Sequence, residues 1–127
     1  MTKKIASYIP AACWFILTIV LLTLPGSTIP KENWLDKIWA DKWVHIVLFG
    51  ILVILWCRAI SISGGEIDSL KKYFILVAVS GIAYGIGMEF VQKHLVSNRS
   101  FDIGDIVADT IGCLAGLLFS WKSYIKK

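Results

Sequence analysis

Four apolar segments of membrane-spanning length are the feature that most restricts the fold of this chain. They cover Ile5–Leu24, Trp43–Ile62, Tyr73–Gln92 and Ile103–Trp121. Each is close to the ~20 residues that a helix needs to cross the hydrocarbon core of a bilayer. The sequence therefore predicts an all-α, polytopic membrane protein. We expect a single domain over residues 1–127, with four transmembrane helices at about 5–24, 43–62, 73–92 and 103–121.

Composition supports a membrane protein. Hydrophobic residues make up 57% of the 127 residues and charged residues 17%, whereas an ordinary soluble domain has roughly 25% charged residues. Lys3 and Lys4 precede the first segment as in a secretion signal, but its apolar run exceeds the roughly 7–15 residues of a signal-peptide core. We expect a retained helix. Cys13, Cys57 and Cys113 lie inside apolar segments without metal-ligand spacing, which is typical of small buried residues.

Lys and Arg residues predict how the four segments cross the membrane. Eight fall on one side (Lys3, Lys4, Arg58, Lys71, Lys72, Lys122, Lys126, Lys127) and five on the other (Lys31, Lys37, Lys42, Lys93, Arg99). The side with more positive charge is expected to be cytoplasmic. We therefore expect a multi-pass protein of the cytoplasmic (inner) membrane with both termini in the cytoplasm. The net charge of +4 belongs mostly to that rim and suggests membrane lipids as partners, with no case for nucleic acid.

Ionisable and amide side chains gather at the outer end of three segments. They are Asp41, Lys42 and His45 on the second, Glu89 and Gln92 on the third, and Asp102, Asp105 and Asp109 on the fourth. Residues three or four apart share a helix face, and a carboxylate that faces lipid is costly. We therefore expect a polar cavity that opens outward between the last three helices, with the first helix as an apolar wall. Gly81-x-x-x-Gly85 and Gly112-x-x-x-Gly116 predict a close approach of the last two helices.

Each polar position also has a structural interpretation. His45 can hydrogen-bond Asp41 one turn back, and Asp102 can cap the start of the fourth helix. Lys42 and Arg99 either neutralise the acids or contact the phosphate or carboxylate of a ligand. Asp105 and Asp109 lie deeper, and two carboxylates one turn apart repel each other when both are ionised.

The functional interpretations fall into three classes. His45, Glu89 and Asp105 are candidate ligands of a divalent metal, although no short metal motif is present, and together with Asp109 they offer a base and an acid for hydrolysis or group transfer on a lipid-linked head group. A binding site for an outward-facing ligand is the second class. A proton- or ion-coupled transporter ranks behind both, because carriers place their sites near the midplane between repeats. The sequence indicates no oligomeric state.

Several motifs resemble the VanZ-like family of membrane proteins. The first half of the pattern is LPGSTIP at 24–30 and DKWVHIVLFG at 41–50; the second half is GMEFVQ at 87–92, NRSFDIGDIVAD at 98–109 and GCLAG at 112–116. The resemblance covers about Leu24 to Leu118. One position departs from the pattern, because the family usually has Asn where this chain has Asp109.

The resemblance implies a setting at the cell envelope and a set of site positions. The family is named after an accessory determinant of low-level resistance to the glycopeptide teicoplanin. It thus implies a protein that binds a lipid head group, a cell-wall precursor or a glycopeptide, with an accessory role in resistance; the alternative is a small intramembrane enzyme on a lipid-linked substrate. No catalytic residue is assigned. The candidate positions are Asp41, Lys42, His45, Glu89, Gln92, Arg99, Asp102 and Asp105, to which this chain adds Asp109.

Overall fold

The computed structural model describes residues 2–24, 40–96 and 101–126, without the side chains of Ala40 and Asp41. These residues form α1 (Lys3–Ala6), α2 (Tyr8–Leu22), α4 (Ala40–Ser63), α5 (Ile67–Leu95) and α6 (Ile103–Ser120), and a π-helical turn, Trp121–Ile125, continues α6. No strand occurs in these ranges. The prediction of an all-α fold is confirmed.

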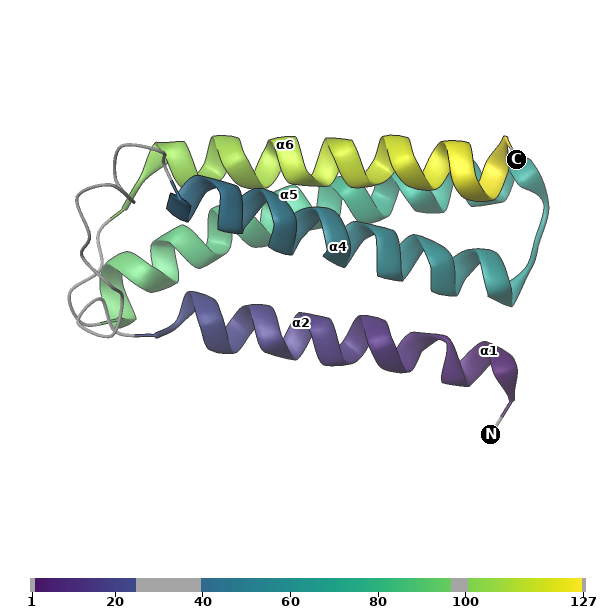
Figure 1. Ribbon diagram of the computed structural model, residues 1–127, viewed down its shortest axis with the longest axis horizontal. Helices are drawn as coiled ribbons and strands as arrows, with labels where there is room; N and C mark the ends of the chain where they lie inside the picture. The colour runs from purple at the N-terminus through teal and green to yellow at the C-terminus, as the bar shows by residue number, and fades with distance from the viewer. Residues whose placement is uncertain (1, 25–39, 97–100, 127) are drawn as a thin grey trace.

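Four helical stretches are long and apolar enough to cross a membrane. They are Lys3–Leu22, which joins α1 and α2, then Lys42–Ser63, Ile67–Leu95 and Ile103–Ile125. They run side by side as a bundle, and both ends of the described chain lie at the same end of it as the connection between α4 and α5 (Figure 1). That connection turns at Gly64 and Gly65, whose φ angles of 86° and 128° suit residues without a Cβ. The prediction of four transmembrane helices is confirmed.

The helices extend beyond the apolar segments of the sequence. α5 begins at Ile67 and has 29 residues, which at 1.5 Å per residue is roughly 44 Å. The hydrocarbon core is only about 30 Å thick. Both ends of α5 therefore reach the interfacial zone, where charged residues such as Asp68 and Lys93 continue the helix.

Glycines bring α4 and α6 into backbone contact. A Cβ atom at Gly112 would lie 2.5 Å from the carbonyl oxygen of Ile46, and one at Gly116 would lie 2.6 Å from that of Gly50. Only hydrogen fits at such positions, so the two backbones meet directly. This pair of helices makes the most extensive contact in the described bundle.

The glycines of α5 make a separate contact with α6. A Cβ atom at Gly81 would lie 2.8 Å from Sγ of Cys113, and one at Gly85 would lie 2.6 Å from Oδ2 of Asp109. The expectation that both glycine pairs join α5 to α6 is therefore half right. Gly81 and Gly85 do join α5 to α6. Gly112 and Gly116 instead contact α4, because α6 packs against both neighbours and its small residues lie on the side of α4.

Helix α2 is held by polar contacts as well as apolar packing. Nε1 of Trp14 donates to the carbonyl of Leu48 at 2.9 Å, and Oγ1 of Thr18 is 2.8 Å from the hydroxyl of Tyr84. These bonds lie inside the apolar segments, where a lost partner is costly. The sequence predicts the first helix as an apolar wall; its polar side chains Trp14 and Thr18 in addition tie it to α4 and α5.

Candidate functional site

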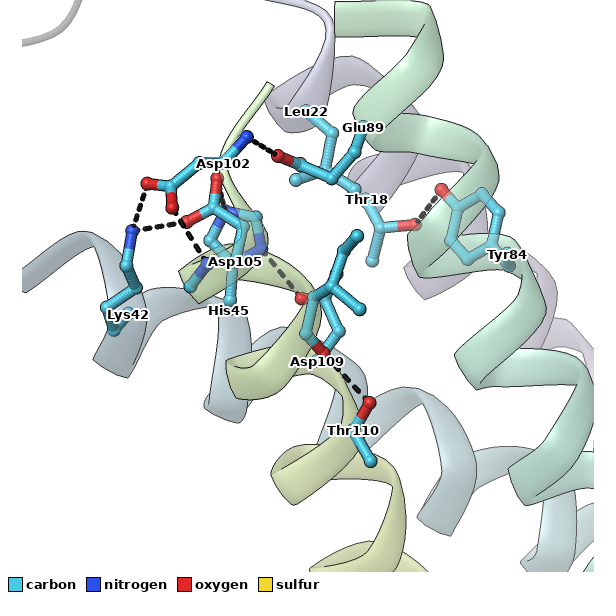
Figure 2. A network of polar contacts seen from close by, with 12 residues as sticks. Thr18, Leu22, Lys42, His45, Tyr84, Glu89, Asp102, Asp105, Asp109 and Thr110 are labelled. Carbon is cyan, nitrogen blue, oxygen red and sulfur yellow. Dashed lines mark hydrogen bonds and ion pairs between the residues drawn. The ribbon is translucent and has the colours of Figure 1, made fainter. Parts of the chain in front are cut away.

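Lys42 is held by two carboxylates across the α4–α6 contact. Its Nζ lies 2.6 Å from Oδ2 of Asp102 and 2.7 Å from Oδ1 of Asp105. Figure 2 shows both contacts at the start of α6. The close approach of the two backbones, one turn further along α4, brings the first turns of these helices together.

His45 lies one turn deeper than Lys42 and faces α6 with both ring nitrogens. Its Nδ1 is 2.7 Å from Oδ1 of Asp109, and its Nε2 is 3.6 Å from Oδ2 of Asp105. The ring is parallel to that of Phe49, one turn further along α4. Asp105 and Asp109 thus face different nitrogens of the same ring, and a shared partner between them reduces the repulsion expected between two acids one turn apart.

Glu89 connects α5 to the beginning of α6. The backbone N–H of Asp102 donates to its Oε1 at 3.0 Å, as Figure 2 shows. The Glu89 side chain is buried, with 1% of the residue exposed. A buried carboxylate that accepts a backbone N–H fixes where the chain enters α6, because both groups would otherwise lack a partner.

Asp102 caps α6, as the sequence predicts. Its Oδ1 accepts from the backbone N–H of Gly104 at 2.8 Å, and its side chain is 44% exposed. The Lys42 ammonium beside it holds the pKa of this carboxyl below its usual value. Asp102 is therefore ionised at neutral pH and is the accessible member of the group.

The sequence predicts an open polar cavity, and among the described residues these side chains contact one another between the helices. Glu89 and Asp109 are 1% and 2% exposed, and His45 is 6% exposed. Ions in a low-dielectric interior are tolerated only when their partners are close, so the acids of α5 and α6 fill the space between the helices with their own contacts. We call Lys42, His45, Glu89, Asp102, Asp105 and Asp109 the polar network.

The remaining candidates lie elsewhere. Gln92 donates through Nε2 to the carbonyl of Leu22 at 2.8 Å, so it ties α5 to the end of α2 instead of joining the polar network. Arg99 and the side chain of Asp41 lie outside the described residues. Among residues 2–24, 40–96 and 101–126, no three His, Cys, Asp or Glu side chains converge as metal ligands. The candidate metal ligands His45, Glu89 and Asp105 do not form such a group.

A groove beside the polar network was not predicted. It has a volume of about 400 Å³ and runs between α4 and α6, lined by Lys42, Trp43, Ile46, Gly104, Val107, Ala108 and Ile111. The stem of Lys42 crosses Gly104, where a Cβ atom would lie 2.7 Å from Cε of Lys42. Apolar residues are expected everywhere in a transmembrane helix, so they do not predict such a groove. The groove depends on how α4 and α6 face each other.

A second hollow lies between α2, α4 and α5. It has a volume of about 300 Å³ and walls that include Phe15, Trp56, Val77 and Tyr84. The hydrogen bond between Thr18 and Tyr84 stands near it and was also missed, although a Thr and a Tyr inside apolar segments are the kind of signal that could have indicated a pair.

The polar network has three chemical capacities. It can hold a proton between His45 and its two carboxylates. It can orient the imidazole, since a carboxylate on Nδ1 fixes the direction of Nε2. At its exposed end, Asp102 and Lys42 offer an acceptor and a cation to a charged group of a ligand.

Four membrane-length helices with a buried polar network near one end define a small polytopic membrane protein. A family model described as VanZ/LLP1 matches residues 7–125, and the chain belongs to this family. An uncharacterized protein of the fission yeast Schizosaccharomyces pombe is 34% identical over 80 residues, which are 63% of this chain and 46% of the yeast protein. The chain thus matches less than half the length of that relative. No solved structure matches significantly.

Proposed function

We propose that this protein binds a membrane phospholipid in the groove between α4 and α6. An acyl chain lies along the apolar walls, and the head group lies beside Lys42 and Asp102. One observation carries the proposal: the groove is apolar along its length and charged at one end, as a lipid is.

The depth of each groove residue agrees with this polarity. Lys42 and Gly104 are near the starts of α4 and α6, whereas Ile111 lies eight residues into α6, roughly 12 Å deeper at 1.5 Å per residue. This difference in depth supports a charged end at the level of lipid head groups and an apolar end within the hydrocarbon. The groove volume of about 400 Å³ falls in the range of roughly 300–1,000 Å³ that is typical of small-molecule sites.

A phospholipid fits better than the other ligands that the family resemblance implies. A glycopeptide or a sugar-peptide precursor would present polar groups to the apolar walls, where they would lose hydration without gaining partners. The similarity to a fission yeast protein also favours a ligand that occurs in yeast membranes, and phospholipids do.

We place the groove and the polar network at the outer face of the cytoplasmic membrane. Eight Lys and Arg residues against five support a cytoplasmic position for both termini. The polar network lies at the starts of α4 and α6, and these starts are at the end of the bundle opposite to both ends of the described chain (Figure 1). The groove would then open toward outer-leaflet lipids.

Native mass spectrometry of the full-length protein in mild detergent tests the lipid site. Val107 is half-exposed and lines the groove, so Val107→Trp should fill it and lower the lipid-bound fraction several-fold. Leu114→Trp is the matched control, because Leu114 is equally exposed on α6 but does not line the groove. Equal lipid retention by the two variants would exclude the groove as the site.

A second candidate function is an intramembrane hydrolase or group transferase. The contact of His45 Nδ1 with Asp109 at 2.7 Å favours it, since a carboxylate that orients an imidazole is a common arrangement for a general base. Purified protein incubated with phospholipid vesicles should then release head group, and His45→Gln should stop the release. No release by the wild-type protein would leave binding as the function.

A further inference from the structure

The charges at the end of the groove indicate which head group it takes. Two carboxylates, Asp102 and Asp105, share the ammonium of Lys42 at 2.6 and 2.7 Å. Behind them, Glu89 and Asp109 add two more carboxyl groups from α5 and α6. Among the described residues, this end of the groove therefore has more acids than permanent cations.

Asp102 is the member of this group that a head group can reach. Its side chain is 44% exposed, while Asp105 is largely covered. Its Oδ1 accepts from Gly104 and its Oδ2 from Lys42, but two carboxylate oxygens offer about four lone-pair positions. Asp102 can thus accept another N–H donor without giving up the helix cap or the Lys42 contact.

An anionic head group suits this environment poorly. Its phosphate would approach Asp102 and Asp105 as closely as Lys42, and like charges at short range repel. A zwitterionic head group carries its own ammonium a few bonds from the phosphate. The ammonium can contact Asp102 while the phosphate faces Lys42, so each charge of the head group lies beside a side chain of opposite charge.

We infer that the groove selects a zwitterionic phospholipid with a protonated primary amine, which donates to Asp102 while its phosphate faces Lys42. This inference rests on the proposed lipid site. A primary ammonium has N–H donors for carboxylate oxygens, whereas a quaternary ammonium has none. Head groups of the ethanolamine type should therefore bind more tightly than those of the choline type.

A competition experiment measures the preference directly. The full-length protein is exchanged with an equimolar mixture of phosphatidylethanolamine, phosphatidylglycerol and phosphatidylcholine of identical acyl chains, and the bound lipids are counted by native mass spectrometry. We expect phosphatidylethanolamine in several-fold excess over each of the others. Stepwise N-methylation of its amine should lower its share step by step, and this part needs no protein variant.

Asp102→Asn tests the protein side, because Asn keeps a capping oxygen for Gly104 and loses the charge. The excess should fall toward equal binding in this variant. Asp68→Asn, which removes an exposed acid at the opposite end of α5, should keep it. A preference for phosphatidylglycerol, or an ethanolamine preference that survives Asp102→Asn, would overturn the inference and leave the lipid site standing. If the Val107→Trp protein retains as much lipid as the wild type, the lipid site itself is overturned.

Discussion

At the scale of single residues, His45 explains how α6 keeps two acids one turn apart. Its two ring nitrogens lie toward Asp109 and Asp105, at 2.7 and 3.6 Å, and Lys42 takes the other oxygen of Asp105 at 2.7 Å. Each carboxylate therefore has an opposite or hydrogen-bonding partner on α4. The pairing of α4 with α6 makes these acids compatible with a transmembrane segment.

Asp109→Asn should preserve the fold and the lipid-bound fraction. An Asn oxygen can accept from Nδ1 of His45 as the carboxylate does, and the amide occupies nearly the same space against Gly85. The substitution also removes one buried acid. Membrane level and lipid retention, measured beside the wild-type protein, should be equal or higher.

Asp109→Leu is the contrasting variant. It has a similar volume but leaves His45 without its closest acceptor, which for a buried group costs about 1–3 kcal/mol. We expect a lower thermal midpoint in detergent than for Asp109→Asn. An Asp109→Asn protein that is abundant and correctly folded but has lost its function in cells would indicate proton transfer by Asp109 instead of simple binding.

Glu89→Ala should destabilise the start of α6. The backbone N–H of Asp102, now paired with Oε1 at 3.0 Å, would lose its acceptor at a cost of about 1–3 kcal/mol. Glu89→Gln keeps an oxygen at that position and should retain most of the stability. Thermal unfolding of both variants in the same detergent decides the matter, and equal midpoints would show that the hydrogen bond contributes nothing.

The Lys42–Asp102 contact should depend on pH in the acid range. Because Lys42 depresses the pKa of Asp102 below 3.8, the contact stabilises the folded state above that value and is lost as the pH falls through the depressed pKa. The difference in thermal midpoint between wild type and Asp102→Asn should be constant at neutral pH and shrink as the pH falls below 3.8. A difference that grows with acidification would contradict this assignment.

At the scale of helices, the glycine contacts determine how α4, α5 and α6 pack. Gly112 and Gly116 meet backbone oxygens of α4, while Gly81 and Gly85 meet side chains of α6. Backbone atoms cannot rotate away as a flexible side chain can. The α4–α6 contact should therefore be the least tolerant of added volume.

Gly112→Ala should cost about 1–3 kcal/mol, the usual penalty for overpacking, because its Cβ would lie 2.5 Å from the carbonyl of Ile46. Gly87→Ala is the control on α5, since nothing lies within 4 Å of its Cβ position. This control should be neutral or stabilising by up to about 1 kcal/mol, because Ala is the better helix former. Equal thermal midpoints for the two variants would contradict the close approach.

The sequence predicts the four helices and the end of the bundle at which the acids lie. It does not predict which side chain each acid contacts. The lengths of the apolar segments are enough to predict the helices, and the positions of Glu89 and Asp105 are enough to predict the polar end. The pairing of His45 with Asp109 depends on how α4 is rotated about its axis. Because α4 is apolar on nearly every face, its sequence does not indicate this rotation. The glycine motif of α6 has the same ambiguity, since it does not say which neighbour it faces.

At the scale of the whole molecule, the proposed orientation can be tested by thiol labelling in intact cells. With Cys13 replaced by Ala, a membrane-impermeant reagent should label Cys introduced at Ser27 or Ser97, which the positive-inside rule puts outside. Cys at Ser69, exposed at the start of α5, should react only after lysis. Labelling of Ser69→Cys in intact cells would invert the orientation.

The α4–α6 pairing also has a consequence for biosynthesis. Lys42 and His45 precede their partners Asp102 and Asp109 by 60 and 64 residues. When α4 leaves the ribosome, the acids of α6 with which these side chains pair have not yet been made. We therefore expect the first turns of α4 to stay at the water interface until α6 has been made and pairs with Lys42 and His45.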